Sequence, residues 1–185
     1  MTVRSRGTMP AILRGVVLIA RGRAEGLNCF GDTPRAVLAS LVPGVGLSFG
    51  TLAAGLAEGQ GLHAVGDMAF LLCVLLAPVV VSFELTRAWG REAFWNRYIV
   101  AFNWCLLLIP MLILIVGLVV GLATGLAGLV VLNVFLCGYA LWMNWFLARH
   151  ALALTAGRSA WLVAGVHVGT ALLIAVPAFL AGALA

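Results

Sequence analysis

The basic residues of this chain are confined to three stretches that alternate with long apolar ones. All 11 are arginines, and no lysine occurs. They precede the first apolar segment, separate the second from the third, and separate the fourth from the fifth: Arg4, Arg6, Arg14, Arg21, Arg23 and Arg35; Arg87, Arg91 and Arg97; Arg149 and Arg158. Because cytoplasmic loops of membrane proteins are enriched in Lys and Arg, this alternation predicts five spans, with the N-terminus cytoplasmic and the C-terminus on the opposite side.

The composition agrees with an integral membrane protein. Apolar residues make up 64% of the chain and charged residues only 9%, against about a quarter charged in soluble proteins. A span needs about 20 residues, so the sequence predicts an all-α, polytopic membrane helix bundle. Residues 1–33 form a cytoplasmic segment and residues 34–185 one five-helix domain, with spans at about 34–57, 67–86, 98–121, 125–148 and 160–184.

The net charge and the positions of the cysteines limit the classes of partner and metal site that the chain is expected to have. The net charge is +5, but the arginines are spread along one predicted membrane face and form no basic tract with interleaved aromatics, which favours anionic lipid over nucleic acid. None of the four cysteines lies in a predicted outer loop, and no CxxC spacing occurs. The sequence therefore predicts neither a disulfide framework nor a zinc site.

The N-terminal segment is expected to contain an amphipathic helix over residues 10–27. Thr8 lies near its cap and Pro10 in its first turn. Arg14, Arg21 and Glu25 lie on one face of this helix. The opposite face is apolar and consists of Ile12, Leu13, Val16, Val17, Ile19, Ala20 and Leu27. Such a helix fits the inner headgroup layer, with its arginines on acidic lipids and Arg23 reaching to the interface. The alternative is a helix packed beneath the bundle.

All six tryptophans lie toward the same predicted side as the arginines: Trp89, Trp95, Trp104, Trp142, Trp145 and Trp161. Tryptophan normally marks both membrane interfaces, so this one-sided set singles out the inner face. Either it is an interfacial belt, or it receives a lipid or a protein partner. The candidate surface consists of Arg14, Arg21, Trp89, Arg91, Trp95, Arg97, Arg149 and Trp161.

Polar side chains inside the predicted spans are few and regularly placed. In the third span, one stripe repeats every seven residues and consists of Asn96, Asn103, Pro110, Gly117 and Thr124. In the fourth span, a second stripe follows one helix face and consists of Asn133, Cys137, Ala140 and Asn144. Both stripes are expected to face protein, because polar groups in lipid are costly. At about 1.5 Å per residue, Asn103 and Asn144 are nearly level and able to form a hydrogen bond.

Together with three residues of comparable depth, they predict a polar cluster in the inner third of the bundle: Asn103, Asn144, His167, Ser82 and Glu84. One interpretation is hydrogen bonding that joins the helices. The other is a proton or solute site, in which His167 changes charge near neutral pH.

No set of residues predicts an enzyme, a metal centre or a cofactor. His63, His150 and His167 lie at different predicted depths, too far apart for one metal ion. The sequence contains no nucleophile elbow, Walker loop or HExxH motif.

Two aromatic runs carry a resemblance to a known family. Tyr98-Ile99-Val100-Ala101-Phe102-Asn103-Trp104 opens the third span, and Trp142-Met143-Asn144-Trp145-Phe146-Leu147-Ala148-Arg149 closes the fourth. With five spans and a cytoplasmic N-terminus, the chain resembles bacterial members of the Yip-type domain superfamily, which implies an inner (cytoplasmic) membrane protein. Eukaryotic relatives are associated with small GTPases, but their Asp-Leu-Tyr-Gly-Pro motif is replaced here by residues 28–32, so GTPase binding is not carried over.

The sequence as a whole predicts a non-enzymatic inner-membrane protein that organises protein partners or lipids at its cytoplasmic face. The alternative is a small transporter or channel-like subunit that uses the polar cluster and helices broken at Pro43, Pro78, Pro110 and Pro177. The expected partners are anionic lipids of the bilayer, another membrane protein, or further copies of the chain.

Overall fold

The computed structural model describes residues 7–184, without the side chains of residues 109, 110, 112–114, 118, 120, 123, 124, 126, 173, 174 and 176–184. Every described element is helical: α1 (Met9–Ala20), the 3-10 helix η2 (Ala24–Cys29), α2 (Pro34–Ala57), α3 (Leu62–Ala88), the 3-10 helix η3 (Glu92–Phe94), α4 (Trp95–Ala151) and α5 (Ala156–Leu184). Arg4 and Arg6, and the side chains of Pro110, Thr124 and Pro177, lie outside the described part. The predicted all-α class is confirmed.

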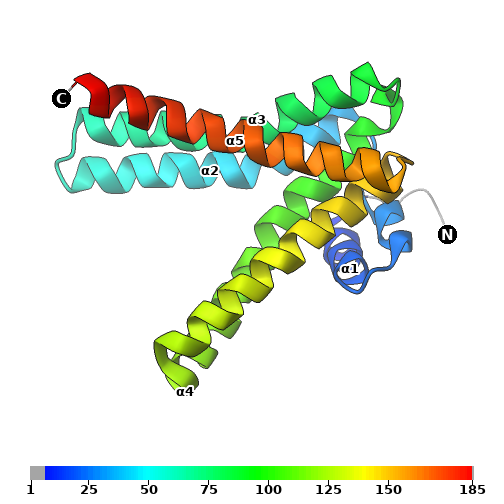
Figure 1. The fold of residues 1–185 in the computed structure, drawn as a ribbon, viewed down its shortest axis with the longest axis horizontal. Coiled ribbons are helices and arrows are strands. Elements are labelled where there is room, and N and C mark those ends of the chain that lie inside the picture. The colour runs from blue at the N-terminus through cyan, green and yellow to red at the C-terminus, as the bar shows by residue number, and fades with distance from the viewer. Residues whose placement is uncertain (1–6, 185) are drawn as a thin grey trace.

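The helices form two arms that diverge from a common base (Figure 1). Helices α2, α3 and α5 lie side by side in one arm, which carries the C-terminus at its far end. The helical hairpin of α4 forms the second arm. Helix α1, η2, η3 and the link between α4 and α5 all lie at the base, where the arms meet.

The first arm begins with a well-defined cap. The Ala36 amide donates to Thr33 Oγ1 at 3.2 Å, and Pro34 occupies the first turn of α2, where its missing N–H is no loss. The bounds of α2 are those predicted. Helix α3 instead begins at Leu62, earlier than predicted, because positive φ angles at Gly59 and Gly61 complete the reversal in a short turn.

Helix α4 reverses direction at Gly125, where the predicted spans 98–121 and 125–148 meet. Gly125 has φ 69° and ψ −159°, a conformation that only glycine adopts readily. On the two limbs of the hairpin, a Cβ at Gly121 would lie 3.1 Å from Leu129 and one at Gly117 would lie 3.8 Å from Leu132. The limbs therefore run antiparallel and in close contact.

The predicted helix over residues 10–27 is corrected to two short elements. Helix α1 ends at Ala20, Gly22 has φ 70° and Arg23 is extended, so that η2 folds back onto α1. A Cβ at Gly26 would lie 2.6 Å from the Gly15 carbonyl oxygen. Two glycines thus allow a backbone approach that periodicity alone does not reveal.

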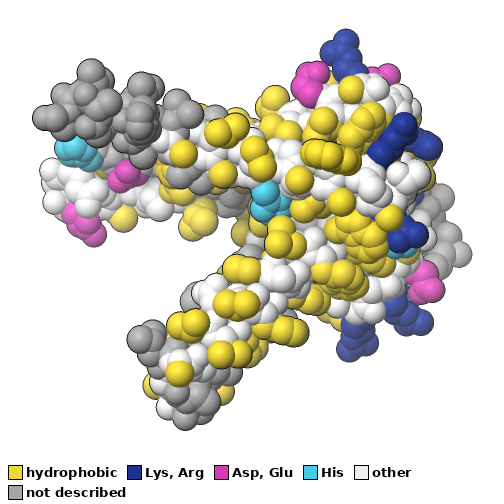
Figure 2. Space-filling view, in the orientation of Figure 1, with side chains coloured by type: hydrophobic (Ala, Val, Ile, Leu, Met, Phe, Trp, Pro, Cys, Tyr) yellow, Lys and Arg dark blue, Asp and Glu magenta, His cyan; other side chains and the backbone are white. Residues whose placement is uncertain are grey.

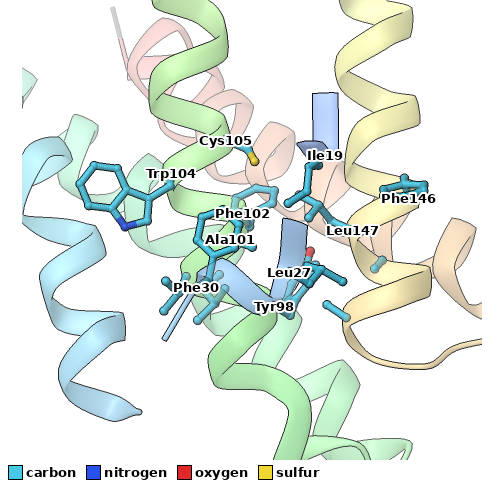
Figure 3. Close-up of a cluster of buried hydrophobic side chains, with 14 of the residues drawn as sticks. Ile19, Leu27, Phe30, Tyr98, Ala101, Phe102, Trp104, Cys105, Phe146 and Leu147 are labelled. Atoms are coloured by element: carbon cyan, nitrogen blue, oxygen red, sulfur yellow. The ribbon is translucent and has the colours of Figure 1, made fainter. Parts of the chain in front are cut away.

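The base holds the hydrophobic core (Figure 3). Every residue from 98 to 105 in the first limb of α4 is buried, as expected for a helix that is surrounded by protein on all sides. Ile19, Leu27 and Phe30 from the N-terminal segment pack with Tyr98 and Phe102. Met143, Phe146, Leu147, Leu152, Leu162 and Val166 complete the cluster from the second limb of α4, its end and α5. The two aromatic runs of the sequence therefore build the core.

The outward-facing sides of the arms are apolar but exposed. Leu38, Val42 and Leu47 on α2 are 65–68% exposed, and Val131 and Val134 on α4 are both 70% exposed. Among the segments searched, Pro34–Ala57, Leu62–Ala88 and Ala127–Ala151 are long and apolar enough to cross a membrane. These three helices fit a membrane protein whose arms face lipid.

Candidate functional site

The described arginines gather at the base of the molecule. They lie on α1 and the turn after it, at the base ends of α2 to α5, and in the loop around η3: Arg14, Arg21, Arg23, Arg35, Arg87, Arg91, Arg97, Arg149 and Arg158. Figure 2 shows the dark-blue side chains at that end, while the tips of both arms carry none in this view. We call this end the arginine face.

Several guanidinium groups on the arginine face are accessible to solvent. Arg14, Arg21 and Arg149 are exposed, and Arg91 and Arg97 are half-buried. Within the described part of the chain, the Nε atom of Arg97 is buried and has no hydrogen-bond partner. Guanidinium groups bind carboxylate and phosphate oxygens through paired N–H donors. The surface thus suits anionic groups.

Arg149 is held at the corner between α4 and α5. Its guanidinium carbon lies 5.2 Å from the centre of the Trp145 ring, a cation-π geometry. The Trp145 indole in turn donates from Nε1 to the Ala156 carbonyl at 3.1 Å. Trp145 therefore both joins the two helices and orients a surface charge.

The three tryptophans of the predicted surface, Trp89, Trp95 and Trp161, differ in their roles. Trp161 is 73% exposed at the start of α5 and is available to a partner or to lipid. Trp89 is half-buried against the core. Trp95 packs edge-to-face on Phe83 at 5.1 Å and donates to Ser82 Oγ at 3.1 Å. Trp95 thus joins α4 to α3 and contributes mainly to the fold.

Asn103 forms a buried contact between the arms, with a partner other than the one expected. Its Nδ2 donates to Ser40 Oγ on α2 at 2.9 Å, and that hydroxyl donates to the Val37 carbonyl at 2.7 Å. Asn144 is also buried, with 7% exposure. No hydrogen bond joins Asn103 and Asn144, so the predicted bond across the hairpin is absent between these two described residues.

The remaining members of the predicted polar cluster do not come together. Ser82 is fully buried, whereas Glu84 is exposed. Residues two apart on a helix point in nearly opposite directions, so the two side chains cannot both face the interior. His167 is exposed beside the buried Val166, and its ring nitrogen Nδ1 lies 2.8 Å from the Val163 carbonyl oxygen of its own helix.

Ser40 is a polar residue of the contact between the arms that sequence reasoning missed. It lies in an apolar span, about 9 Å from the start of α2, while Asn103 lies about 12 Å from the start of α4. Depth alone would thus have allowed the pair. What the sequence did not reveal is that the base of α4 packs against α2 as well as within its own hairpin.

A double-mutant cycle tests the Ser40 to Asn103 hydrogen bond. We expect Ser40→Ala and Asn103→Ala together to cost less than the sum of the single changes, by about 0.6 kcal/mol, the average for hydrogen bonds between membrane helices. The free energy of unfolding in detergent is the quantity to measure. Pairing Asn103→Ala with Ser48→Ala, a buried serine bonded to its own helix at Gly44, should give additive changes. Coupling as large for Ser48 would contradict the assignment.

Comparisons with family models, curated proteins and solved structures found no match to this chain. The resemblance to the Yip-type domain superfamily stays a prediction.

Proposed function

We propose that this protein is a non-enzymatic, five-span protein of the bacterial inner membrane that binds anionic lipid headgroups or an acidic membrane partner through its arginine face. The observation that carries the proposal is the gathering of the described arginines around the packed base. Arginines near a membrane surface attract anionic lipids, with about 1 kcal/mol from each.

The placement of α1 supports contact with a membrane surface. Ile12, Val16 and Ile19 pack into the core, which fixes the helix beneath the bundle. Leu13 and Val17 remain 48% exposed. Exposed leucine and valine beside exposed arginines suit a helix that lies partly among headgroups and partly on protein, which combines the two alternatives raised by the sequence.

Binding is a better proposal than transport because the described residues of the predicted polar cluster are divided between buried contacts and the surface. The buried pair Ser40 with Asn103 and the partly buried pair Ser82 with Trp95 each join two elements at the base. His167 and Glu84 point away from the interior. The polar groups therefore act in this proposal as helix-joining hydrogen bonds.

Lipid binding is tested by adding phosphatidylglycerol or phosphatidylcholine to the purified full-length protein and counting bound lipids by native mass spectrometry. We expect a preference for phosphatidylglycerol. Arg149→Gln and Arg21→Gln should each lower its affinity about fivefold, the equivalent of about 1 kcal/mol. Arg149→Lys keeps the charge, and Gln60→Ala lies in the turn at the far end of the first arm, so neither should have a comparable effect. Equal binding of both lipids would contradict lipid recognition.

The orientation is tested separately in intact cells with a membrane-impermeant maleimide, in a chain whose native cysteines are replaced. His63→Cys lies in the first turn of α3, beside the α2–α3 link, and should be labelled from outside. Gly157→Cys, in the first turn of α5, should be labelled only after the cells are opened. Labelling of position 157 in intact cells would overturn the proposed orientation.

A further inference from the structure

The polar stripe on the second limb of α4 is divided between the core and the surface. Asn144 is 7% exposed within the base. Asn133 and Cys137, farther along the same face, are exposed. The stripe was expected to face protein along its whole length, but within this chain only its base end does.

Asn133 lies deep in a candidate membrane span. It belongs to Ala127–Ala151, one of the helices long and apolar enough to cross a membrane. Trp142 and Trp145 mark the interface at the base end of this limb, and at 1.5 Å per residue Asn133 lies about 14 to 18 Å beyond them. Half of a bilayer's hydrocarbon core is about 15 Å thick. The carboxamide of Asn133 therefore falls near the middle of the bilayer.

Its surroundings on the helix surface are apolar. Val130, Val134 and Phe135 are exposed by 57%, 70% and 68%. The Cys137 thiol lies 3.6 Å from the Asn133 side-chain oxygen, but a thiol is a weak donor. Most of the hydrogen-bonding capacity of the carboxamide therefore faces lipid chains, which can neither donate nor accept. Polar side chains at this depth almost always face protein.

We propose that a second copy of this chain covers the face formed by Asn133 and Cys137, with the two Asn133 side chains bonded to each other across a two-fold axis. A carboxamide carries both a donor and an acceptor, so it is complementary to its own copy, as a two-fold interface requires. A single buried asparagine sets pairing in coiled coils in the same way.

The neighbouring residues allow the close approach that this contact needs. Ala140 lies seven residues from Asn133, about 20° around the helix, and its small side chain is half-buried. Small residues on a membrane helix surface let two backbones come close together. The inference depends on the membrane placement of α4 but not on lipid binding at the arginine face, so either can fail alone.

Cys137 allows a direct test in the membranes of expressing cells. We use the full-length chain with Cys73→Ala, since Cys73 is the other cysteine classed as exposed among the described residues, and oxidise with copper phenanthroline. The expected result is a dimer that is reduced by dithiothreitol and is lost with Cys137→Ala. For a matched control, Val131→Cys is introduced with Cys137→Ala. Val131 is 70% exposed and lies about 160° around the helix from Asn133, so this thiol should form little dimer.

The role of Asn133 is tested in the same background. Asn133→Leu should lower the cross-linked fraction about threefold or more, the equivalent of one hydrogen bond between membrane helices, while Asn133→Gln should restore much of it. Thermal unfolding of each variant identifies loss of folding as a separate cause. Absence of the Cys137 dimer, equal cross-linking at position 131, or an unchanged yield with Asn133→Leu in a folded protein would each overturn the proposal.

Discussion

Replacing Leu162 by alanine is expected to lower the free energy of unfolding by about 2–5 kcal/mol. Leu162 is fully buried in the core at the base, where α5 meets α4. The change removes packed methyl groups and leaves a cavity, because a core fixed by several helices collapses only partly around it. In detergent the unfolded helices remain surrounded by apolar chains, so the methyl groups of Leu162 meet an apolar environment in both states. The hydrophobic contribution to the loss is then small, and a value near the lower limit is expected.

The control for this prediction lies on the same helix. Leu172 is 57% exposed on α5, so Leu172→Ala removes the same atoms from a surface that faces lipid in the proposed orientation. Its effect on unfolding should be below about 1 kcal/mol. Denaturation followed by tryptophan fluorescence measures both variants. A loss at position 172 equal to that at 162 would mean that the arms, and not the base, carry the packing.

Replacing Gly125 by alanine is expected to destabilise the α4 hairpin by about 1–3 kcal/mol. With φ 69° and ψ −159°, Gly125 occupies a region where a Cβ collides with the adjacent backbone. No other heavy atom lies within 4 Å of a Cβ placed there, so the expected loss comes from the backbone conformation alone. Unfolding monitored by circular dichroism in detergent provides the measurement.

Gly46→Ala is the matched control for Gly125→Ala. A Cβ at Gly46 also meets nothing within 4 Å, but Gly46 lies inside α2 and no positive φ is found there. Alanine is favoured over glycine in a helix by about 0.5–1 kcal/mol, so this variant should be unchanged or slightly more stable. If Gly125→Ala behaves in the same way, the hairpin turn does not depend on the conformation of Gly125.

The sequence predicted those features that depend on local chemistry. The predicted span 34–57 has the bounds of α2, which Thr33 caps and Pro34 begins, and the turn at Gly125 falls where the predicted span 98–121 gives way to 125–148. The N-terminal helix was predicted too long because its end depends on Gly22 and on the contact of Gly26 with Gly15. That contact joins residues on two elements and leaves no periodic pattern.

The candidate site could be predicted only in part, for a similar reason. The positions of the arginines between the apolar segments predicted that they gather at one end, because the order of the helices alone determines on which end each connection lies. The polar cluster required knowledge of how each helix is rotated. Ser82 and Glu84 were both placed in the predicted cluster, although side chains two residues apart on a helix point in nearly opposite directions. Asn103 was paired with Asn144, but its partner is Ser40 on α2.

The divergence of the two arms has a mechanical consequence. Among the described side chains, three polar bonds link the hairpin of α4 to the other arm, and all lie at the base: Asn103 to Ser40, Trp95 to Ser82, and Trp145 to Ala156. Each limb extends about 35 Å beyond these bonds. A rotation of about 5° at the base would displace the tip of the hairpin by about 3 Å. A small rotation at the base is thus amplified into a larger displacement at the tip of the hairpin.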